Sequence, residues 1–265
     1  TSRTVHHLLR EPGSIPDQLR FQVEALAAEF QFFHWHLEFP GIFTVPDDVS
    51  EETDPQTGWI GGFACMLGNP PWERVKLQDK EWFAAVGRND LASISNAAKR
   101  RLAIQELAEN DPPLFAAYER ARRRSAAIAH FLLNSGRYPL TGRGDVNTYP
   151  VFAETFRALI SPSGSAGIIT PTGLATDKTT SAFFSDLVSS HTLASLHDFV
   201  TNPRLWAVIG HGKFRFSVTN IRGRAAGIQR VRLSFFSKYP TDVTGDRVYY
   251  VTPEEMQLLN PNTGN

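Results

Sequence analysis

GFACMLGNPPWERV, residues 62–75, joins an apolar run to a turn that holds two prolines. Residues 60–67 have the length and composition of a short buried strand, so the string Asn69-Pro70-Pro71-Trp72 is expected at the carboxyl end of that strand. Ligands of α/β sheets gather outside the carboxyl ends of the strands. The stretch therefore predicts an α/β sheet with a ligand site at this turn.

The chemistry of the turn follows from what its residues lack. Pro70 and Pro71 have no N–H, and each proline biases the residue before it toward an extended conformation. The turn thus presents carbonyl acceptors and few donors. Together with the Asn69 side-chain oxygen, these acceptors converge beside the Trp72 ring, an arrangement that suits a planar group bearing an NH2. The alternative is a proline turn that ends a strand, with Trp72 as a core residue.

Two acceptors that hold the hydrogens of an aromatic amine would localise its lone pair on nitrogen and allow attack on an electrophilic methyl group. A base inside a duplex cannot reach a strand end, so it would have to be flipped out and stacked on an aromatic side chain. Trp72 is the expected stacking surface.

The rest of the chain alternates between strand and helix patterns. Helices are expected at about 14–35, 148–160 and 177–189, and Ser161–Gly164 is expected to connect the second helix to a strand. The alternation predicts a mainly parallel sheet with helices on its faces, and the late run of strands predicts an antiparallel edge. The further expected strands are 166–171, 193–200, 214–221 and 231–237.

The chain has four expected parts: an N-terminal helical segment (1–45), the strand and turn (46–89), a helical insertion (90–136) and the remaining strands and helices (137–265). The insertion carries basic clusters at Lys99–Arg101 and Arg120–Arg124. These clusters are either phosphate contacts or a solvated face, and both interpretations remain open.

Composition narrows the function classes. The 265 residues contain 27 Lys and Arg against 27 Asp and Glu, so no global positive field marks a nucleic-acid partner and any such contact must be local. The one cysteine, Cys65, excludes an internal disulfide and fits a reducing, cytoplasmic setting. No secretory leader or membrane-length apolar stretch is visible, so no membrane partner is expected.

Four stretches together resemble one enzyme family. The Asn-Pro-Pro-Trp string looks like motif IV of the amino-group DNA methyltransferases, and the chain resembles the large adenine-N6 methyltransferases of type IIG restriction-modification and related phage-defence systems such as DISARM. The resemblance implies an α/β fold, the C-terminal part of a class I (Rossmann-like) methyltransferase sheet with a helical insertion. It rests on FHWHLEFPGIF (33–43), residues 61–84, residues 137–188 and LNPNTG (259–264).

The resemblance also implies roles for individual residues. Asn69 and the Pro70 carbonyl would hold the amine, with Pro71 completing the motif, and Trp72 would stack on the flipped adenine. Asp145 and Asn147 would lie near the cofactor. Tyr149 and Trp206 would contact the substrate base, Trp206 by a looser match in the loop 201–214.

S-adenosylmethionine is the implied cofactor and double-stranded DNA the implied substrate. Enzymes of this fold hold the cofactor on a glycine-rich loop after the first strand, and no such loop precedes residue 60. We therefore expect the cofactor half and the target-recognition domain in the remainder of a parent polypeptide, and weak or no cofactor binding by residues 1–265 alone.

Two other function classes remain open. A protein glutamine-N5 methyltransferase uses a similar motif, because a carboxamide NH2 poses the same chemical problem. A non-catalytic scaffold fragment is the other alternative. A metal site at His34-Trp35-His36 is disfavoured because no third ligand at suitable spacing accompanies the pair, and no metal is expected.

Overall fold

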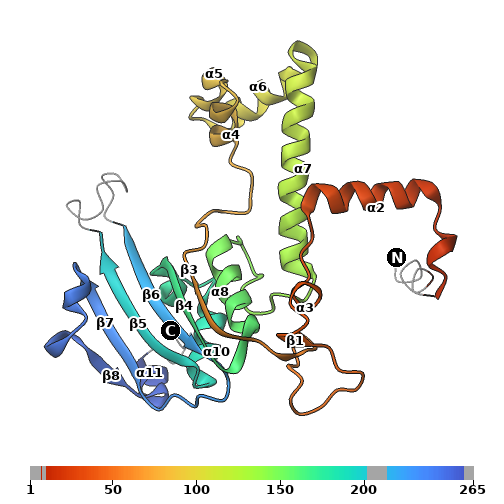
Figure 1. The fold of residues 1–265 in the computed structure, drawn as a ribbon. Helices are drawn as coiled ribbons and strands as arrows, with labels where there is room; N and C mark the ends of the chain where they lie inside the picture. The colour runs from red at the N-terminus through yellow and green to blue at the C-terminus, as the bar shows by residue number, and fades with distance from the viewer. Residues whose placement is uncertain (1–6, 8–9, 202–213, 260–265) are drawn as a thin grey trace. The chain divides into compact units, whose positions relative to one another are not determined.

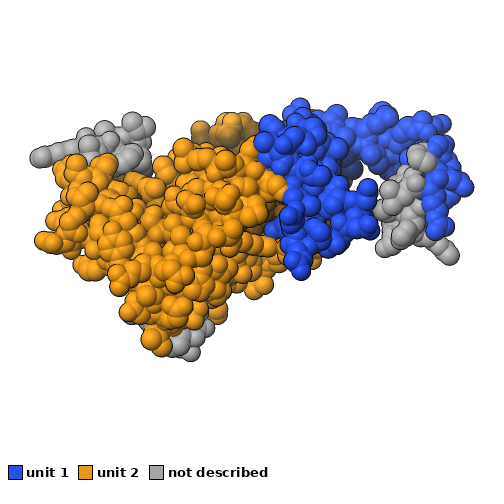
Figure 2. Space-filling model, turned by 60° about the horizontal axis from the view of Figure 1, so that its bottom comes forward, with its two compact units in different colours: residues 1–54, 58–60 blue, residues 55–57, 61–265 orange. Residues whose placement is uncertain are grey.

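The computed structural model describes residues 7, 10–201 and 214–259. The chain divides into two compact units, coloured separately in Figure 2. Unit 1 comprises residues 1–54 and 58–60, and unit 2 comprises residues 55–57 and 61–265.

Unit 1 is built from short elements and one longer helix. Its elements are η1 (Pro12–Ser14), α2 (Asp17–Phe30), α3 (Trp35–Glu38) and β1 (Phe43–Thr44), and β1 pairs with β2 (Ile60–Gly61). Helix α2 begins three residues later than Ser14, directly after Pro16, and none of its residues is buried. The buried pair Phe43 and Trp59, whose ring centroids lie 5.0 Å apart, forms the interior of this unit.

Unit 2 is built on a six-stranded mixed sheet, visible at the lower left of Figure 1. The strand order is β3-β4-β6-β5-β7-β8. Strands β3 and β4 are parallel, as are β5 and β7, whereas β6 runs antiparallel to both β4 and β5 and β8 runs antiparallel to β7. The strands are β3 (Phe63–Gly68), β4 (Ile160–Pro171), β5 (Leu193–Val200), β6 (Arg215–Arg222), β7 (Val231–Ser237) and β8 (Tyr249–Val251).

The strand predictions for the second half of the chain are confirmed, but their arrangement differs from the expected one. Antiparallel pairing was expected at an edge of the sheet. It occurs at the edge strand β8, but also inside the sheet, where β6 lies between β4 and β5. The residues 161–164, expected as a connection, belong to β4, whose pairing with β3 shifts register between Phe63 and Cys65 to accommodate them.

Helices cover one face of this sheet. These helices are α8 (Thr148–Leu159), α9 (Gly173–Thr176), α10 (Ser181–Ser189) and α11 (Pro253–Leu259). The core joins Ala153 of α8 and Phe183 of α10 to inward-facing strand residues such as Ile168 and Ile221, all fully buried. The helix expected at 177–189 is shorter than predicted, because α10 begins at Ser181 and leaves Asp177 outside it. Just before this start, the Thr180 hydroxyl donates to the carbonyls of Gly173 and Asp177.

Strand β3 corrects the prediction of a buried strand. It lies at one edge of the sheet, and Cys65 and Leu67 are exposed, the latter at 79%. Only the alternate residue Met66 packs against the core below α8 and α10. A continuous apolar run is typical of a strand covered on both faces, but the described part of the chain covers only one face of β3.

A helical region interrupts the sheet between β3 and β4. It begins at Asp79, before the expected boundary at residue 90, and its two longer helices pack around buried Phe83, Ile104 and Tyr118. The Asp111 carboxylate accepts from Leu114 N at the start of the last helix, where prolines occupy the first helical positions. The helices are α4 (Asp79–Ala85), α5 (Asn89–Ala92), α6 (Ala97–Asn110) and α7 (Pro112–Asn134).

Among the described residues, no helix combines the length and the apolar character needed to cross a membrane. The same residues contain no group of three or more His, Cys, Asp or Glu side chains placed to hold a metal ion.

Candidate active site at the carboxyl end of β3

The Asn-Pro-Pro-Trp turn leaves the sheet directly at the end of β3. Gly68 is the last strand residue, and a Cβ atom there would lie 2.8 Å from the ring of Phe156 on α8. The glycine thus lets an aromatic ring of α8 pack against the strand just before the turn. Pro70 is buried, whereas Asn69 is exposed. Asn69, whose side chain carries the expected acceptor, is therefore accessible, and the buried Pro70 anchors the turn.

Trp72 lies at the border of an open hollow of about 650 Å³. Its side chain is 37% exposed. The hollow is lined by residues 72–78, by Glu81 of α4 and by Ser125 of α7. Its charged residues are Glu73, Arg74, Lys76 and Glu81. A ring with part of its surface accessible leaves room for a base to stack on it.

The segment after the turn is held by the residues that lead into α8. Arg74 and Asn147 form an antiparallel bridge. Val75 N donates to Val146 O at 3.1 Å, and Thr148 N donates to Glu73 O at 2.9 Å. Residues 73–75 and 146–148 thus run side by side, and the start of α8 sets the position of the turn.

The Thr148 side chain makes three further contacts with the turn and the residue after it, the longest of them a 3.2 Å approach of its hydroxyl to the Glu73 carbonyl. Its hydroxyl donates to the Pro71 carbonyl at 2.6 Å and accepts from Glu73 N at 3.0 Å. These two groups flank Trp72 on either side in the chain. The role of Thr148 was not foreseen from the sequence, and its only signal there is a hydroxyl at the first position of a helix that follows an Asn.

Asp145 and Asn147 lie on the segment that pairs with the turn. The Asp145 carboxylate is 60% exposed, and its 3.7 Å approach to the exposed Arg74 guanidinium contributes little because water screens the pair. Asn147 precedes α8 without capping it through its side chain, and its Oδ1 atom is buried without a hydrogen-bond partner. A buried acceptor without a donor is costly, and the described contacts leave Asn147 Oδ1 unsatisfied.

Tyr149, expected at the substrate base, lies in the hydrophobic core with 5% of its surface exposed. Its hydroxyl donates to Asp177 Oδ2 at 3.3 Å. Burial, followed by the nearby Asp177 carboxylate, raises the pKa of Tyr149 well above its usual range. Tyr149 therefore supports α8 and α9 from within, and its contact with a base stays a prediction.

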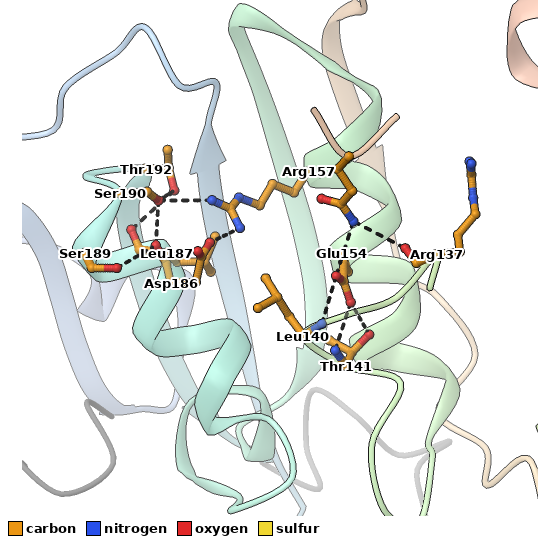
Figure 3. Close-up of polar contacts among 11 residues, drawn as sticks. Arg137, Leu140, Thr141, Glu154, Arg157, Asp186, Leu187, Ser189, Ser190 and Thr192 are labelled. Carbon is orange, nitrogen blue, oxygen red and sulfur yellow. Dashed lines mark hydrogen bonds and ion pairs between the residues drawn. The ribbon is translucent and has the colours of Figure 1, made fainter. Parts of the chain in front are cut away.

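The loop that carries Asp145 is fixed by a buried carboxylate on α8, shown in Figure 3. Glu154 is 1% exposed. Its oxygens accept from Leu140 N at 3.2 Å, from Thr141 N at 2.9 Å and from the Thr141 hydroxyl at 2.5 Å. Gln56 Nε2 also donates to it, at 3.4 Å. The carboxylate thus accepts hydrogen bonds from the donors of the turn at 140–141, from which the chain continues to residues 145–148.

A second polar contact in Figure 3 joins α8 to α10. Arg157, whose side chain is 10% exposed, forms an ion pair with Asp186 and donates to the Ser190 hydroxyl at 3.1 Å. Helix α8 is therefore tied to α10 as well as to the turn, which makes it the main support of the site.

The carboxyl end of β5 carries another buried carboxylate. Asp198 is fully buried and accepts from the Thr172 hydroxyl at 2.6 Å, from the Arg215 guanidinium at 2.7 Å and from Phe236 N at 3.0 Å. These hydrogen bonds join residues at or next to the ends of β4, β5, β6 and β7, so the cluster holds these strand ends together. Trp206, the second base contact expected from the sequence, lies outside the described residues.

No family model matches the chain, and no curated protein matches it in sequence. Similarity to solved structures is distant. A type I restriction-modification methyltransferase subunit from Streptococcus thermophilus is 11% identical, with 83% of this chain and 39% of that chain covered and a TM-score of 0.39. The type IIG restriction endonuclease BpuSI is 15% identical, with 50% and 17% covered and a TM-score of 0.35.

The ATP-dependent type ISP restriction-modification enzyme LlaBIII, bound to DNA in its structure, is 10% identical, with 66% and 10% covered and a TM-score of 0.34. This chain thus spans from 10% to 39% of the length of these three proteins. The function is therefore inferred from the residues of the site.

Proposed function

We propose that this chain carries the amine-holding part of a site-specific DNA adenine-N6 methyltransferase of a restriction-modification or phage-defence system. The observation that carries the proposal is the turn at the end of β3. It combines an exposed Asn69 side chain, a proline pair without backbone donors and a half-exposed Trp72 ring at an open hollow. This combination of acceptors and an aromatic surface suits a flipped base with an exocyclic amine.

In the proposed reaction, Asn69 Oδ1 and the Pro70 carbonyl accept the two hydrogens of the adenine amine. This grip localises the nitrogen lone pair toward the methyl donor, and Trp72 stacks on the ring. The new N–C bond would form as the S–CH3 bond of the donor breaks and a neutral thioether leaves. One proton of the alkylated nitrogen, which is then acidic, would pass to solvent water. No side chain of this turn has to act as a base before the attack.

S-adenosylmethionine would supply the methyl group from its sulfonium. Asp145, with an exposed carboxylate, and Asn147, with its unpartnered buried Oδ1, are two acceptors that fit the donor groups of such a molecule. The main cofactor-binding residues are proposed to belong to the remainder of the polypeptide. The exposed apolar residues of the edge strand β3 support this proposal, because in a larger parallel sheet further strands pair with such an edge and helices cover its open face.

The proposal is tested by Asn69→Ala in the intact protein. We expect methyl transfer to duplex DNA to fall about a hundredfold or more, because an acceptor that strengthens in the transition state is lost. Binding of S-adenosylmethionine, measured by calorimetry, should stay near that of the wild type. Asn110→Ala, at an exposed position at the end of α6, is the matched control and should leave both measurements unchanged. Near-normal turnover of Asn69→Ala would contradict the mechanism.

The choice of substrate separates the two enzyme classes. Methyl transfer to duplex DNA with none to a glutamine-containing protein supports the adenine enzyme, and the reverse result supports the glutamine enzyme. A protein that binds no cofactor in its intact form would be a scaffold.

The stacking role of Trp72 is tested by Trp72→Phe and Trp72→Ala. Stacking of a base on an aromatic ring contributes about 1–3 kcal/mol, so Trp72→Ala should weaken binding to DNA with a mismatched target position, where flipping costs least. Trp72→Phe keeps a ring face and should bind nearly as well as the wild type. A large fall in melting temperature of Trp72→Ala, as for loss of a core residue, would show a structural role instead.

A further inference from the structure

The Asn-Pro-Pro-Trp turn has few hydrogen bonds of its own to hold its shape. Pro70 and Pro71 have no N–H, so the first backbone donors after Asn69 belong to Trp72 and Glu73. The conformation of the turn must therefore be held from outside. The described contacts that do this come from the start of α8, at residues 146–148.

Thr148 makes contacts of a kind that the backbone pairing alone cannot supply. A threonine hydroxyl has one donor and two acceptor sites. Here it donates to the Pro71 carbonyl at 2.6 Å and accepts from Glu73 N at 3.0 Å, so it closes a bridge around Trp72.

We propose that Thr148 is a positioning residue, whose hydroxyl fixes the turn so that Asn69, the Pro70 carbonyl and Trp72 meet the base in the reactive geometry. This inference rests on the proposed methyl transfer. Thr148 touches neither the base nor the methyl donor, and it acts through the backbone on both sides of Trp72. A displacement of about 1 Å at a reacting centre costs about a hundredfold in rate, so a loosened turn should slow the transfer step.

The bridge itself is tested by hydrogen exchange of the intact protein, which needs no activity. Thr148→Val keeps the shape of the side chain and removes the hydroxyl, so exchange in a peptide covering residues 69–75 should become faster. Thr148→Ser restores the hydroxyl and should return the exchange to the wild-type rate. The matched control is Thr155→Val on the same helix, whose hydroxyl donates to Val151 O and is remote from the turn in sequence.

The consequence for the reaction is tested by the kinetics of methyl transfer to duplex DNA. For Thr148→Val we expect kcat to fall about 10- to 100-fold with little change in the KM for DNA and for S-adenosylmethionine, with recovery in Thr148→Ser. Thr155→Val should retain the wild-type kcat, while its melting temperature should match that of Thr148→Val. This match separates positioning from a general loss of stability.

The outcomes separate this inference from the proposed function. Unchanged exchange in Thr148→Val, or unchanged kcat despite faster exchange, overturns the positioning role while methyl transfer by the wild type stands. An intact protein that transfers no methyl group to DNA overturns the proposed function and with it the kinetic role of Thr148. The exchange experiment then still decides whether the hydroxyl holds the turn.

Discussion

Strands β3 and β4 are parallel neighbours that each contain an apolar stretch, and their surroundings are very different. In β4, Ala166 and Ile168 are fully buried between α8, α10 and the central strands. In β3, Leu67, which is paired with Gly167 of β4, is 79% exposed, and Cys65 is exposed as well. Leu67 shares a face with Gly167, whereas Ala166 and Ile168 point to the opposite face, which α8 and α10 cover. The face on which an apolar side chain lies, and not its composition, therefore sets its burial here.

The difference also bears on function. The candidate site begins where the exposed strand ends, whereas the buried strand supports it from one side through α8. Central strands contribute most of the stability because they bury apolar surface on packing, while an open edge contributes little until another chain segment covers it. Substitutions should therefore change the free energy of unfolding most at the centre of the sheet and least at its open edge.

Ile168→Ala should have the largest effect. Ile168 is fully buried at the centre of the sheet, and its truncation should lower the free energy of unfolding by about 3 kcal/mol, since the cavity adds to the lost transfer free energy. Urea unfolding of the 265-residue chain, followed by circular dichroism, measures this change. A loss below about 1 kcal/mol, the range of a well-tolerated core swap, would show that the centre of the sheet is loosely packed.

Gly68→Ala should have an intermediate effect, at the point where the edge strand meets α8. The added Cβ would lie 2.8 Å from the Phe156 ring, so the ring must shift. Overpacking of this kind should cost about 1 kcal/mol in unfolding free energy. The double variant Gly68→Ala, Phe156→Leu removes the end of the ring and should be less affected by the alanine than the wild type is. Equal effects of Gly68→Ala in both backgrounds would rule out this contact as the cause.

Leu67→Ser should change the unfolding free energy of the 265-residue chain by less than about 0.5 kcal/mol, as for an exposed position. In a longer protein in which a further segment covers the open face of β3, the same substitution should cost more, because it would then remove buried apolar surface. Unfolding curves of the two forms measure the difference. A loss of about 2 kcal/mol or more in the 265-residue chain, typical of core truncation, would contradict the exposed edge.

Cys65 offers a test with no expected change in stability. It is the one cysteine of the chain, and it is exposed on β3. A thiol-specific chromogenic reagent should therefore label the native 265-residue chain without denaturant, at a rate close to that of the unfolded chain. Protection of Cys65 in the native chain would show that β3 is covered, and protection only in the intact protein would indicate a covering segment there.

The sequence by itself determined the elements and the motif. Periodicity and length predicted strands 193–200 and 231–237 and the helix that starts at Thr148, since these properties depend on neighbours along the chain. The proline pair placed Asn69 and Trp72 at the end of a strand for a local reason too: prolines end backbone pairing wherever they occur. Local chemistry therefore sufficed to find the candidate turn.

Only the tertiary structure decided what holds that turn and which strand lies at the edge. Thr148 lies 77 residues after Pro71, and their hydrogen bond exists because β4 and α8 pack beside β3. Glu154 likewise gains its buried partners only when the loop at 140–141 folds back onto α8. The exposure of Leu67 also depends on which face of the sheet the helices cover. Pairings between residues far apart in the chain leave no periodic signal within either segment, so packing alone revealed them.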